Sequence, residues 1–256
     1  MRLDKYLSDM NVGTRKELKT KIRKGVVTVD GARITDPGFS VKGDESVTFE
    51  GQPIHYHTFE YYMLNKPAGV ITATEDKRQQ TVIDLLGKDR RKDLFPVGRL
   101  DKNTVGLLLI TNDGDLNHRL LSPKKHVDKK YYAKIDGCVT EADVDAFAKG
   151  LRIDEELTAL PATLEILTFR DEATASDKED LLTSEHPEST LSSGVTEICV
   201  TIREGKFHQI KRMFHAVGKE VFYLKRLSMG RLVLDPALAE GSWRPLTEEE
   251  IRMLNT

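Results

Sequence analysis

Asp101 is the residue whose type and setting best suit covalent or acid–base chemistry, because its carboxylate stands between two cations. Arg99 and Lys102 flank it within PVGRLDKNTVGLLLITNDG, residues 96–114. An ionised carboxylate can serve as a nucleophile or as a base. By itself, however, an aspartate just before a strand is more often a turn or capping residue. The catalytic interpretation of Asp101 therefore depends on motifs elsewhere in the chain.

Two later segments supply side chains that could complete a site around Asp101. Tyr131 lies in KKYYAKIDG, residues 129–137, which predicts a strand. Lys211 lies in EGKFHQIKRMFHAVG, residues 204–218, which predicts a turn that leads into a basic helix. Taken alone, Tyr131 is typical of a half-buried strand tyrosine, and Lys211 of a solvated helix lysine. Only their combination with Asp101 favours a catalytic site.

The segment that follows Asp101 predicts a rigid support for it. Residues 105–110 are apolar and rich in branched side chains, and the turn signal Asn112-Asp113-Gly114 comes directly after them. Such a short, bounded run predicts a buried strand. Asp101 is then expected on a loop just ahead of a core strand, held firmly but open to a cleft.

The element pattern predicts two domains with an α+β fold. Residues 1–50 combine two short helices with a hairpin at Asp30-Gly31, and Thr14 with Glu17 forms a capping-box pattern. We expect a linker at residues 51–59 and a second domain at 60–256, built on a mixed or antiparallel sheet flanked by helices. Residues 171–194 are rich in Ser, Thr, Asp and Glu and predict an exposed insertion, which could be disordered.

The overall composition is ordinary for a soluble globular protein. The chain has 256 residues, of which 39% are hydrophobic and 31% charged. No apolar run approaches the roughly 20 residues of a membrane helix, and MRLDKYLSDM has no signal-peptide core. We therefore expect a cytoplasmic protein with no membrane partner, and no motif suggests more than a monomer.

The distribution of charge favours an anionic partner despite a net charge of −2. Basic residues gather at 15–24, 119–134 and 203–231, whereas acidic residues gather at 171–188 and 248–250. Segregation of this kind can give a nearly neutral chain a positive face that binds nucleic acid.

The sequence predicts neither a cofactor nor a metal. It lacks a Gly-x-Gly-x-x-Gly loop and a P-loop, and Cys138 and Cys199 have no ligand at metal-binding spacing. His55 and His57 are interpreted as linker residues.

The order of motifs in residues 1–50, RLDKYL, TRKELKTKIRKGVVTVDG and GDESVTF, resembles the S4 RNA-binding domain. The resemblance implies that outward cations of its two helices contact phosphates, which positions an RNA without reading its sequence. The cations assigned to this role are Arg2, Lys5, Arg15, Lys16, Lys19, Lys21, Arg23 and Lys24.

The second domain resembles the pseudouridine synthases. MLNKPAGV, GRLDKNTVGLLLITNDG, KKYYAKIDG and EGKFHQIKRMFHAVG occur in that family's order, and the chain is most similar to the branch that modifies small-subunit ribosomal RNA (the RsuA type). The resemblance implies an S4 domain followed by a pseudouridine synthase catalytic domain, and an isomerase that needs no cofactor.

The same resemblance implies roles for five residues. Asp101 matches the catalytic aspartate, Tyr131 the tyrosine that lies against the target base, and Lys211 the basic residue that pairs with the aspartate. Arg99 matches an arginine that helps to flip the nucleotide or fills the vacated space, and Leu224 an apolar residue packed in the active site. Further RNA contacts are expected at Arg119, Lys129, Lys206, His208, Gln209 and Arg212.

The expected substrate is a uridine of small-subunit (16S) ribosomal RNA, in small-subunit assembly intermediates. Two alternatives remain open from the sequence. One is the same chemistry on large-subunit ribosomal RNA. The other is a non-catalytic RNA-binding factor in ribosome assembly.

Overall fold

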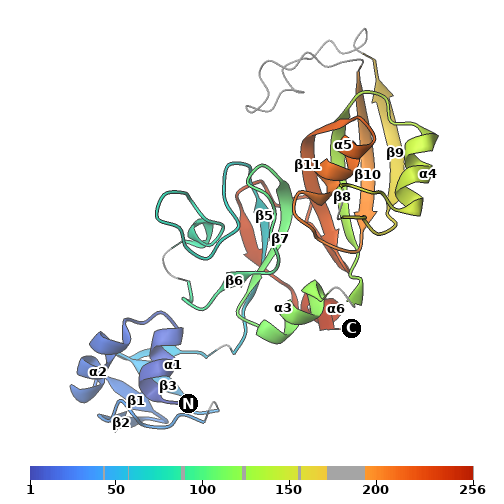
Figure 1. Cartoon of the computed structure of the whole chain (residues 1–256). Coiled ribbons are helices and arrows are strands. Elements are labelled where there is room, and N and C mark those ends of the chain that lie inside the picture. Colours follow the sequence, from blue (N-terminus) through green and yellow to red (C-terminus); the bar gives the residue numbers. More distant parts are fainter. Residues whose placement is uncertain are drawn as a thin grey trace.

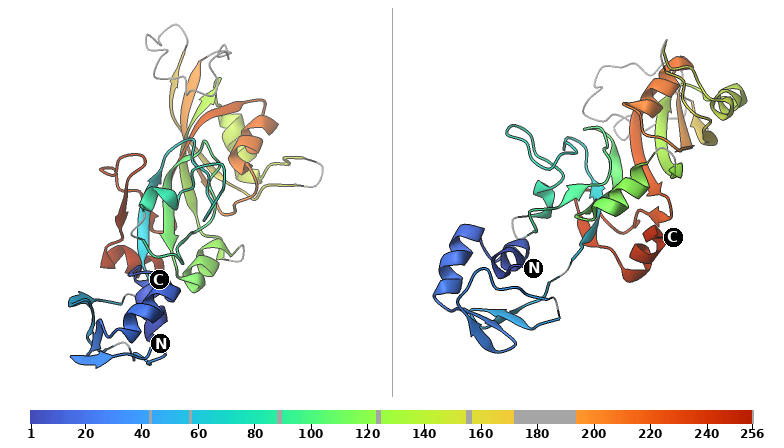
Figure 2. Two further views of the ribbon diagram at one scale, coloured as in Figure 1. Left: turned by 90° about the vertical axis from the view of Figure 1, so that its left-hand side faces the viewer. Right: turned by 60° about the horizontal axis from the view of Figure 1, so that its bottom comes forward.

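The protein forms two domains joined end to end, as the computed structural model shows (Figures 1 and 2). The structure describes residues 1–42, 44–56, 58–87, 90–122, 125–154, 157–171 and 194–255. The predicted insertion at 171–194 therefore lies outside the described residues except at its two ends. Among the described residues, no helix combines the length and apolar character that crossing a bilayer requires.

The first domain packs two helices against a small antiparallel sheet with the strand order β2-β1-β3-β4. Its elements are α1 Leu3–Asp9, α2 Arg15–Arg23, β1 Val27–Val29, β2 Ala32–Ile34, β3 Val47–Phe49 and β4 Gln52–Ile54. The predicted capping box is present, because Thr14 accepts a hydrogen bond from the Glu17 N–H and Glu17 accepts one from the Thr14 N–H. Asp30 and Gly31 both have positive φ, as a primed hairpin turn requires.

The predicted start of the linker at residue 51 is wrong. Gly51 forms the turn between β3 and β4, and Gln52–Ile54 pairs with β3 as the fourth strand of the sheet. Glu50 has a φ of 50° and Gly51 a φ of 81°. Glutamate is not a usual residue for a left-handed turn position, so the sequence offered no clear hairpin signal there.

The second domain is built on a mixed nine-stranded sheet with the path β13-β5-β7-β11-β8-β10-β9, to which β6 and β12 are attached (Figure 1). Its strands are β5 Tyr61–Lys66, β6 Phe95–Pro96, β7 Val105–Thr111, β8 Lys129–Asp136, β9 Thr163–Arg170, β10 Val195–Ile202, β11 Glu220–Met229, β12 Leu232–Val233 and β13 Trp243–Pro245. Its helices are η1 Asp84–Leu86, α3 Gly114–Leu121, α4 Glu141–Lys149, α5 Gln209–Ala216 and α6 Glu248–Asn255.

The central strand β7 is buried along its whole length, with an apolar cluster on each of its two faces. Leu108 and Ile110 belong to the cluster that includes Phe147 of α4 and Phe214 of α5, whose ring centroids are 4.8 Å apart. Leu107 and Leu109 belong to the opposite cluster, which includes buried residues of α3 and α6. The predicted buried strand at residues 105–110 is therefore confirmed, and it divides two apolar layers.

The pairing of β7 with β11 is the one parallel pair among the described strands, and it is unusually close. Gly106 pairs with Arg226 and has a φ of 97°. A Cβ at Gly106 would lie 2.4 Å from the Arg226 carbonyl oxygen. The Arg226 side chain is 2% exposed, and its Nε donates to the Leu107 carbonyl oxygen at 2.7 Å. These contacts join the β13-β5-β7 half of the sheet to the β11-β8-β10-β9 half.

Gly106→Ala is expected to lower the free energy of unfolding by about 2–5 kcal/mol, because an alanine there must adopt a left-handed backbone and displace the Arg226 backbone. Urea denaturation measures the change. Gly114→Ala is the matched control, since a Cβ there meets nothing within 4 Å, and it should shift stability by less than about 1 kcal/mol. Equal stability of the two variants would contradict the role given to Gly106.

Candidate functional site

One cleft gathers all five of the predicted catalytic side chains. Its walls come from the loop ahead of β7, from β8 and β11, and from the segment that leads into α5. The lining residues are Arg99, Leu100, Asp101, Thr104, Tyr131, Ile202, Gly205, Lys206, His208, Gln209, Ile210, Lys211 and Leu224. Residues more than 100 positions apart in the sequence thus meet because β7, β11 and β8 are neighbours in the sheet (Figure 1).

Tyr131 and Leu224 form the apolar part of the cleft. Tyr131 is 7% exposed on β8, and Leu224 is 6% exposed on β11. Leu224 pairs across the strands with Ala133, so it lies diagonally beside Tyr131 on the same face of the sheet. Both side chains belong to the larger core cluster, which holds their positions.

The loop that carries Asp101 is fixed by a buried lysine to which the sequence analysis gave no role. Lys66 lies at the end of β5 and is fully buried. Its Nζ donates to the carbonyl oxygens of Pro67 and Lys102, each at 2.9 Å, and of Thr104 at 3.0 Å. The sequence signal for Lys66 was its position at the end of an apolar strand and directly before a proline. This signal does not show that the side chain points into the protein.

A second contact fixes the same loop one residue ahead of Asp101. The Thr72 hydroxyl donates to the Leu100 carbonyl oxygen at 2.7 Å and accepts from the Leu100 N–H at 3.2 Å. The Thr104 N–H donates to the Asp101 carbonyl oxygen at 3.1 Å and closes a turn. The Asp101 side chain remains 29% exposed, so its carboxylate is both held in place and open to the cleft.

Burial strongly affects the Lys66 ammonium group. Desolvation lowers its pKa to about 8, although the negative charges of Asp101 and Glu240 act in the opposite direction. The group therefore remains largely protonated at neutral pH and places a positive charge behind the Asp101 loop.

The ionisable side chain closest to the Asp101 carboxylate is that of His208, and not that of Lys211 as predicted. The His208 Nε2 atom lies 3.5 Å from Asp101 Oδ1. His208 immediately precedes α5 and has a φ of 48°, a left-handed conformation that turns its ring toward the cleft. Lys211 lines the cleft but forms no ion pair with Asp101 within 4 Å in the described part of the chain. Their predicted pairing is therefore absent from this arrangement.

Of the predicted RNA contacts, Lys129 is wrong because its side chain is buried away from the cleft, whereas Gln209 lines the cleft but is bound within the protein. Lys129 is 8% exposed, and its Nζ donates to the Val127 carbonyl oxygen at 3.1 Å. Gln209 is 4% exposed; its Oε1 accepts from the Lys206 N–H and its Nε2 donates to Glu204. Gln209 thus shapes the turn ahead of α5. The sequence pattern correctly predicted that Lys129 lies in a strand and Gln209 in the first turn of a helix. It did not show that the side of each element that carries these residues is buried.

The other predicted contacts differ in how available their charges are. Lys206 pairs with Glu204 at 3.0 Å, Arg212 pairs with Asp154, and Arg119 is exposed on α3. In the first domain, Arg2 and Arg15 both pair with the buried Asp4, Lys5 pairs with Asp9, and Lys21 pairs with Glu50. Among the cations assigned to RNA binding in the first domain, those of Lys16, Lys19, Arg23 and Lys24 on or beside α2 are exposed and have no ion pair within the described residues.

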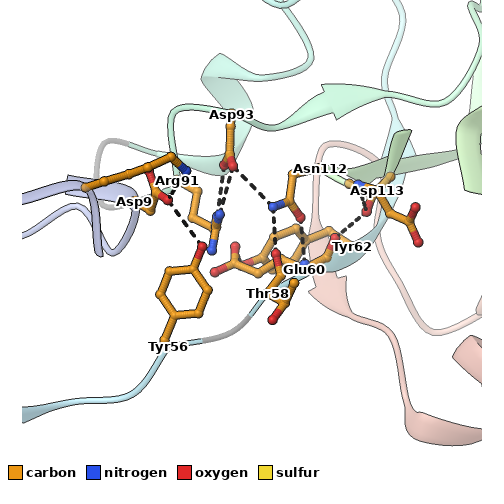
Figure 3. Close-up of polar contacts among 11 residues, drawn as sticks. Asp9, Tyr56, Thr58, Glu60, Tyr62, Arg91, Asp93, Asn112 and Asp113 are labelled. Carbon is orange, nitrogen blue, oxygen red and sulfur yellow. Dashed lines mark hydrogen bonds and ion pairs between the residues drawn. The ribbon is translucent and has the colours of Figure 1, made fainter. Parts of the chain in front are cut away.

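Polar and aromatic contacts join the two domains beside the linker (Figure 3). The Tyr56 ring packs against Tyr6 of the first domain, and its hydroxyl donates to Asp9 at 3.2 Å. The guanidinium of Arg91, from the second domain, lies 5.5 Å from the Tyr56 ring centroid. Arg91 donates two hydrogen bonds to Asp93, at 2.9 and 2.8 Å. We call this group the interdomain joint.

Asn112 connects the interdomain joint to the turn after β7. Its Nδ2 donates to Asp93 at 3.2 Å and to the Thr58 carbonyl oxygen at 3.0 Å, and its Oδ1 accepts from the Glu60 N–H at 2.9 Å (Figure 3). The linker is therefore bound to the strand that follows the Asp101 loop.

Comparison with known proteins gives consistent similarities along the whole chain. Residues 60–216 match the family described as RNA pseudouridylate synthase, and residues 1–47 match the S4 domain. The chain is 48% identical over 257 residues to the Bacillus subtilis (strain 168) protein named "Uncharacterized RNA pseudouridine synthase YtzG", covering 100% of this chain and 98% of that protein.

Two further matches cover almost the full length. "Ribosomal small subunit pseudouridine synthase A" of Escherichia coli (strain K12) is 36% identical over 254 residues, with 98% of each chain covered. The solved structure titled "Crystal structure of pseudouridylate synthase" has a TM-score of 0.64 at 32% identity and covers 99% of both chains.

The burial of Lys66 predicts a distinct pH dependence of stability. In the unfolded chain its amine keeps its proton up to about pH 10.5, whereas in the folded chain it loses the proton near pH 8. Between these values the unfolded state binds more protons, so rising pH favours the folded state. The unfolding free energy of the wild type minus that of Lys66→Met should increase by up to about 3 kcal/mol from pH 8 to pH 10.5. Urea denaturation across this range tests it, and a difference that stays constant with pH would contradict it.

Proposed function

Because the chain belongs to the family of RNA pseudouridylate synthases, we propose that it converts one uridine of small-subunit ribosomal RNA into pseudouridine. The observation that carries the proposal is the cleft that Asp101 shares with Tyr131 and Leu224. The name of the 36% identical Escherichia coli protein supports the small ribosomal subunit as the source of the substrate.

The cleft suits an isomerisation in which the base never leaves the site. The bond from ribose C1′ to uracil N1 breaks, the base rotates, and C1′ forms a bond to C5 while the C5 hydrogen is lost and N1 gains one. No atom or electron is imported, so no redox or group-transfer partner is required. Asp101 is the reactive carboxylate in this proposal, acting on the sugar or on the base.

The apolar and cationic parts of the site have complementary tasks in this reaction. A target uridine must leave its stack, which costs a few kcal/mol, and the buried ring of Tyr131 with Leu224 gives the flipped base an apolar surface. Arg99 is exposed at the cleft, where it can replace the base or hold the adjoining backbone. Lys211 lines the same cleft and adds positive charge that can contact the RNA backbone.

The first domain supplies contacts to RNA outside the cleft. Lys16, Lys19, Arg23 and Lys24 present exposed cations along α2, a spacing that suits a phosphate backbone. We propose that the protein works as a cytoplasmic monomer on ribosomal RNA within small-subunit assembly intermediates. Mapping pseudouridines in ribosomal RNA from cells with and without the protein tests the substrate, and a change confined to large-subunit RNA would contradict it.

Asp101→Asn is expected to reduce pseudouridine formation by about 10³-fold or more, because the amide can act neither as the nucleophile nor as the base. RNA affinity and thermal stability should remain close to those of the wild type. Product is measured by mass spectrometry of nucleosides from treated small-subunit RNA. Asp115→Asn, an exposed aspartate in the first turn of α3, is the matched control and should retain full activity. Comparable activity of the two variants would remove Asp101 from the reaction.

A further inference from the structure

Phe207 is the most exposed large hydrophobic side chain in the described part of the protein, at 68%. A single exposed hydrophobic residue is ordinary on a protein surface. Phe207 differs because of its place in the chain, between Lys206 and His208, which both line the catalytic cleft. Its own ring is not among the lining residues, so it stands at the rim.

The ring of Phe207 is stacked on the ring of His208. Their centroids are 3.8 Å apart, and the ring planes differ by 18°. Through its Nε2 atom, at the edge of the ring, His208 approaches the Asp101 carboxylate at 3.5 Å. The stacked pair therefore extends from the carboxylate to the surface, where the exposed ring of Phe207 can receive another flat ring.

The surroundings of this ring combine cations with little exposed apolar surface. Leu160, 41% exposed, is joined to the same turn through the hydrogen bond that its N–H donates to Glu204 at 2.9 Å, and cations are close. Arg212 Nη1 donates to the Phe207 carbonyl oxygen at 3.4 Å, and Arg99 and Lys211 line the adjoining cleft. An aromatic ring with cations beside it is the combination that binds single-stranded nucleic acid, whose bases stack while its phosphates contact the cations.

We propose that Phe207, supported by His208, is a stacking platform for the nucleotide next to the target uridine. The proposal rests on the proposed function. When the uridine enters the cleft, its neighbour in the strand loses a stacking partner, and the open face of Phe207 replaces it. Because every base has a π-face, the platform selects unpaired RNA at this position without selecting one base.

Fluorescence of 2-aminopurine tests the contact directly. The probe is a single-stranded RNA heptanucleotide with one central uridine and 2-aminopurine either just before or just after it. Binding to the wild type should quench the fluorescence at one of the two positions. Phe207→Ala should abolish that quenching and weaken binding about tenfold, whereas Phe207→Tyr should retain both.

Phe169→Ala is the matched control, because Phe169 is 42% exposed on β9 and does not line the cleft. It should behave as the wild type in both measurements. Equal quenching by the wild type and Phe207→Ala, or no quenching at either position, would overturn the proposal. A concentration-dependent dimer that only Phe207→Ala loses, seen by sedimentation with the probe unquenched, would assign the ring to a contact between copies and also overturn it.

Turnover on small-subunit ribosomal RNA separates this proposal from the proposed function. Phe207→Ala should raise KM about tenfold, with recovery in Phe207→Tyr. If the wild type forms pseudouridine and Phe207→Ala does so with unchanged KM, the stacking proposal alone fails. If the wild type modifies no ribosomal RNA, the proposed function fails, and the quenching experiment still decides whether Phe207 stacks on a base.

Discussion

The parallel pairing of β7 with β11 requires glycine at position 106, because the Arg226 backbone passes where a side chain would lie. This close contact joins the two halves of the sheet. One half carries the Asp101 loop, and the other carries Tyr131 and Leu224. The distance between the Asp101 carboxylate and the apolar surface of Tyr131 and Leu224 is therefore set in the core, well away from solvent, and the cleft has the rigidity of the sheet.

The position of the Asp101 carboxylate depends on two residues, one buried and one partly exposed. Lys66 is buried and uses its three donors to fix the loop around Asp101 from behind. His208 approaches the same carboxylate from the solvent side, on a backbone held in a left-handed conformation. Strained conformations of this kind persist where the surrounding structure enforces them, and Gln209 and Glu204 brace the turn here. The carboxylate is thus located from both sides.

Much of this arrangement could be predicted from the sequence, because motif order and apolar periodicity identify both domains, strand β7 and the side chains that meet in the cleft. The sequence could not show whether a given polar side chain points into the protein or toward solvent. Lys66 and Lys129 are lysines that turn inward, and nothing in their neighbours distinguishes them from solvated ones. The hairpin at Glu50-Gly51 depends on left-handed backbone at Glu50, a residue with little preference for it, and nothing in the sequence shows that His208 is also left-handed. Such features arise from tertiary contacts rather than local preference.

The interdomain joint bears on the proposed binding of one RNA by the α2 cations and the cleft together. With a freely flexible linker, the α2 cations and the cleft would bind their parts of an RNA independently. After the first part had bound, the affinity of the second would be raised only by the effective concentration that the linker sets. Arg91 packed on Tyr56, with Asn112 binding the linker backbone, restrains that search before RNA arrives. The entropy of orienting the two parts is then lost during folding and not during binding, and an RNA with a matching spacing gains avidity that others do not.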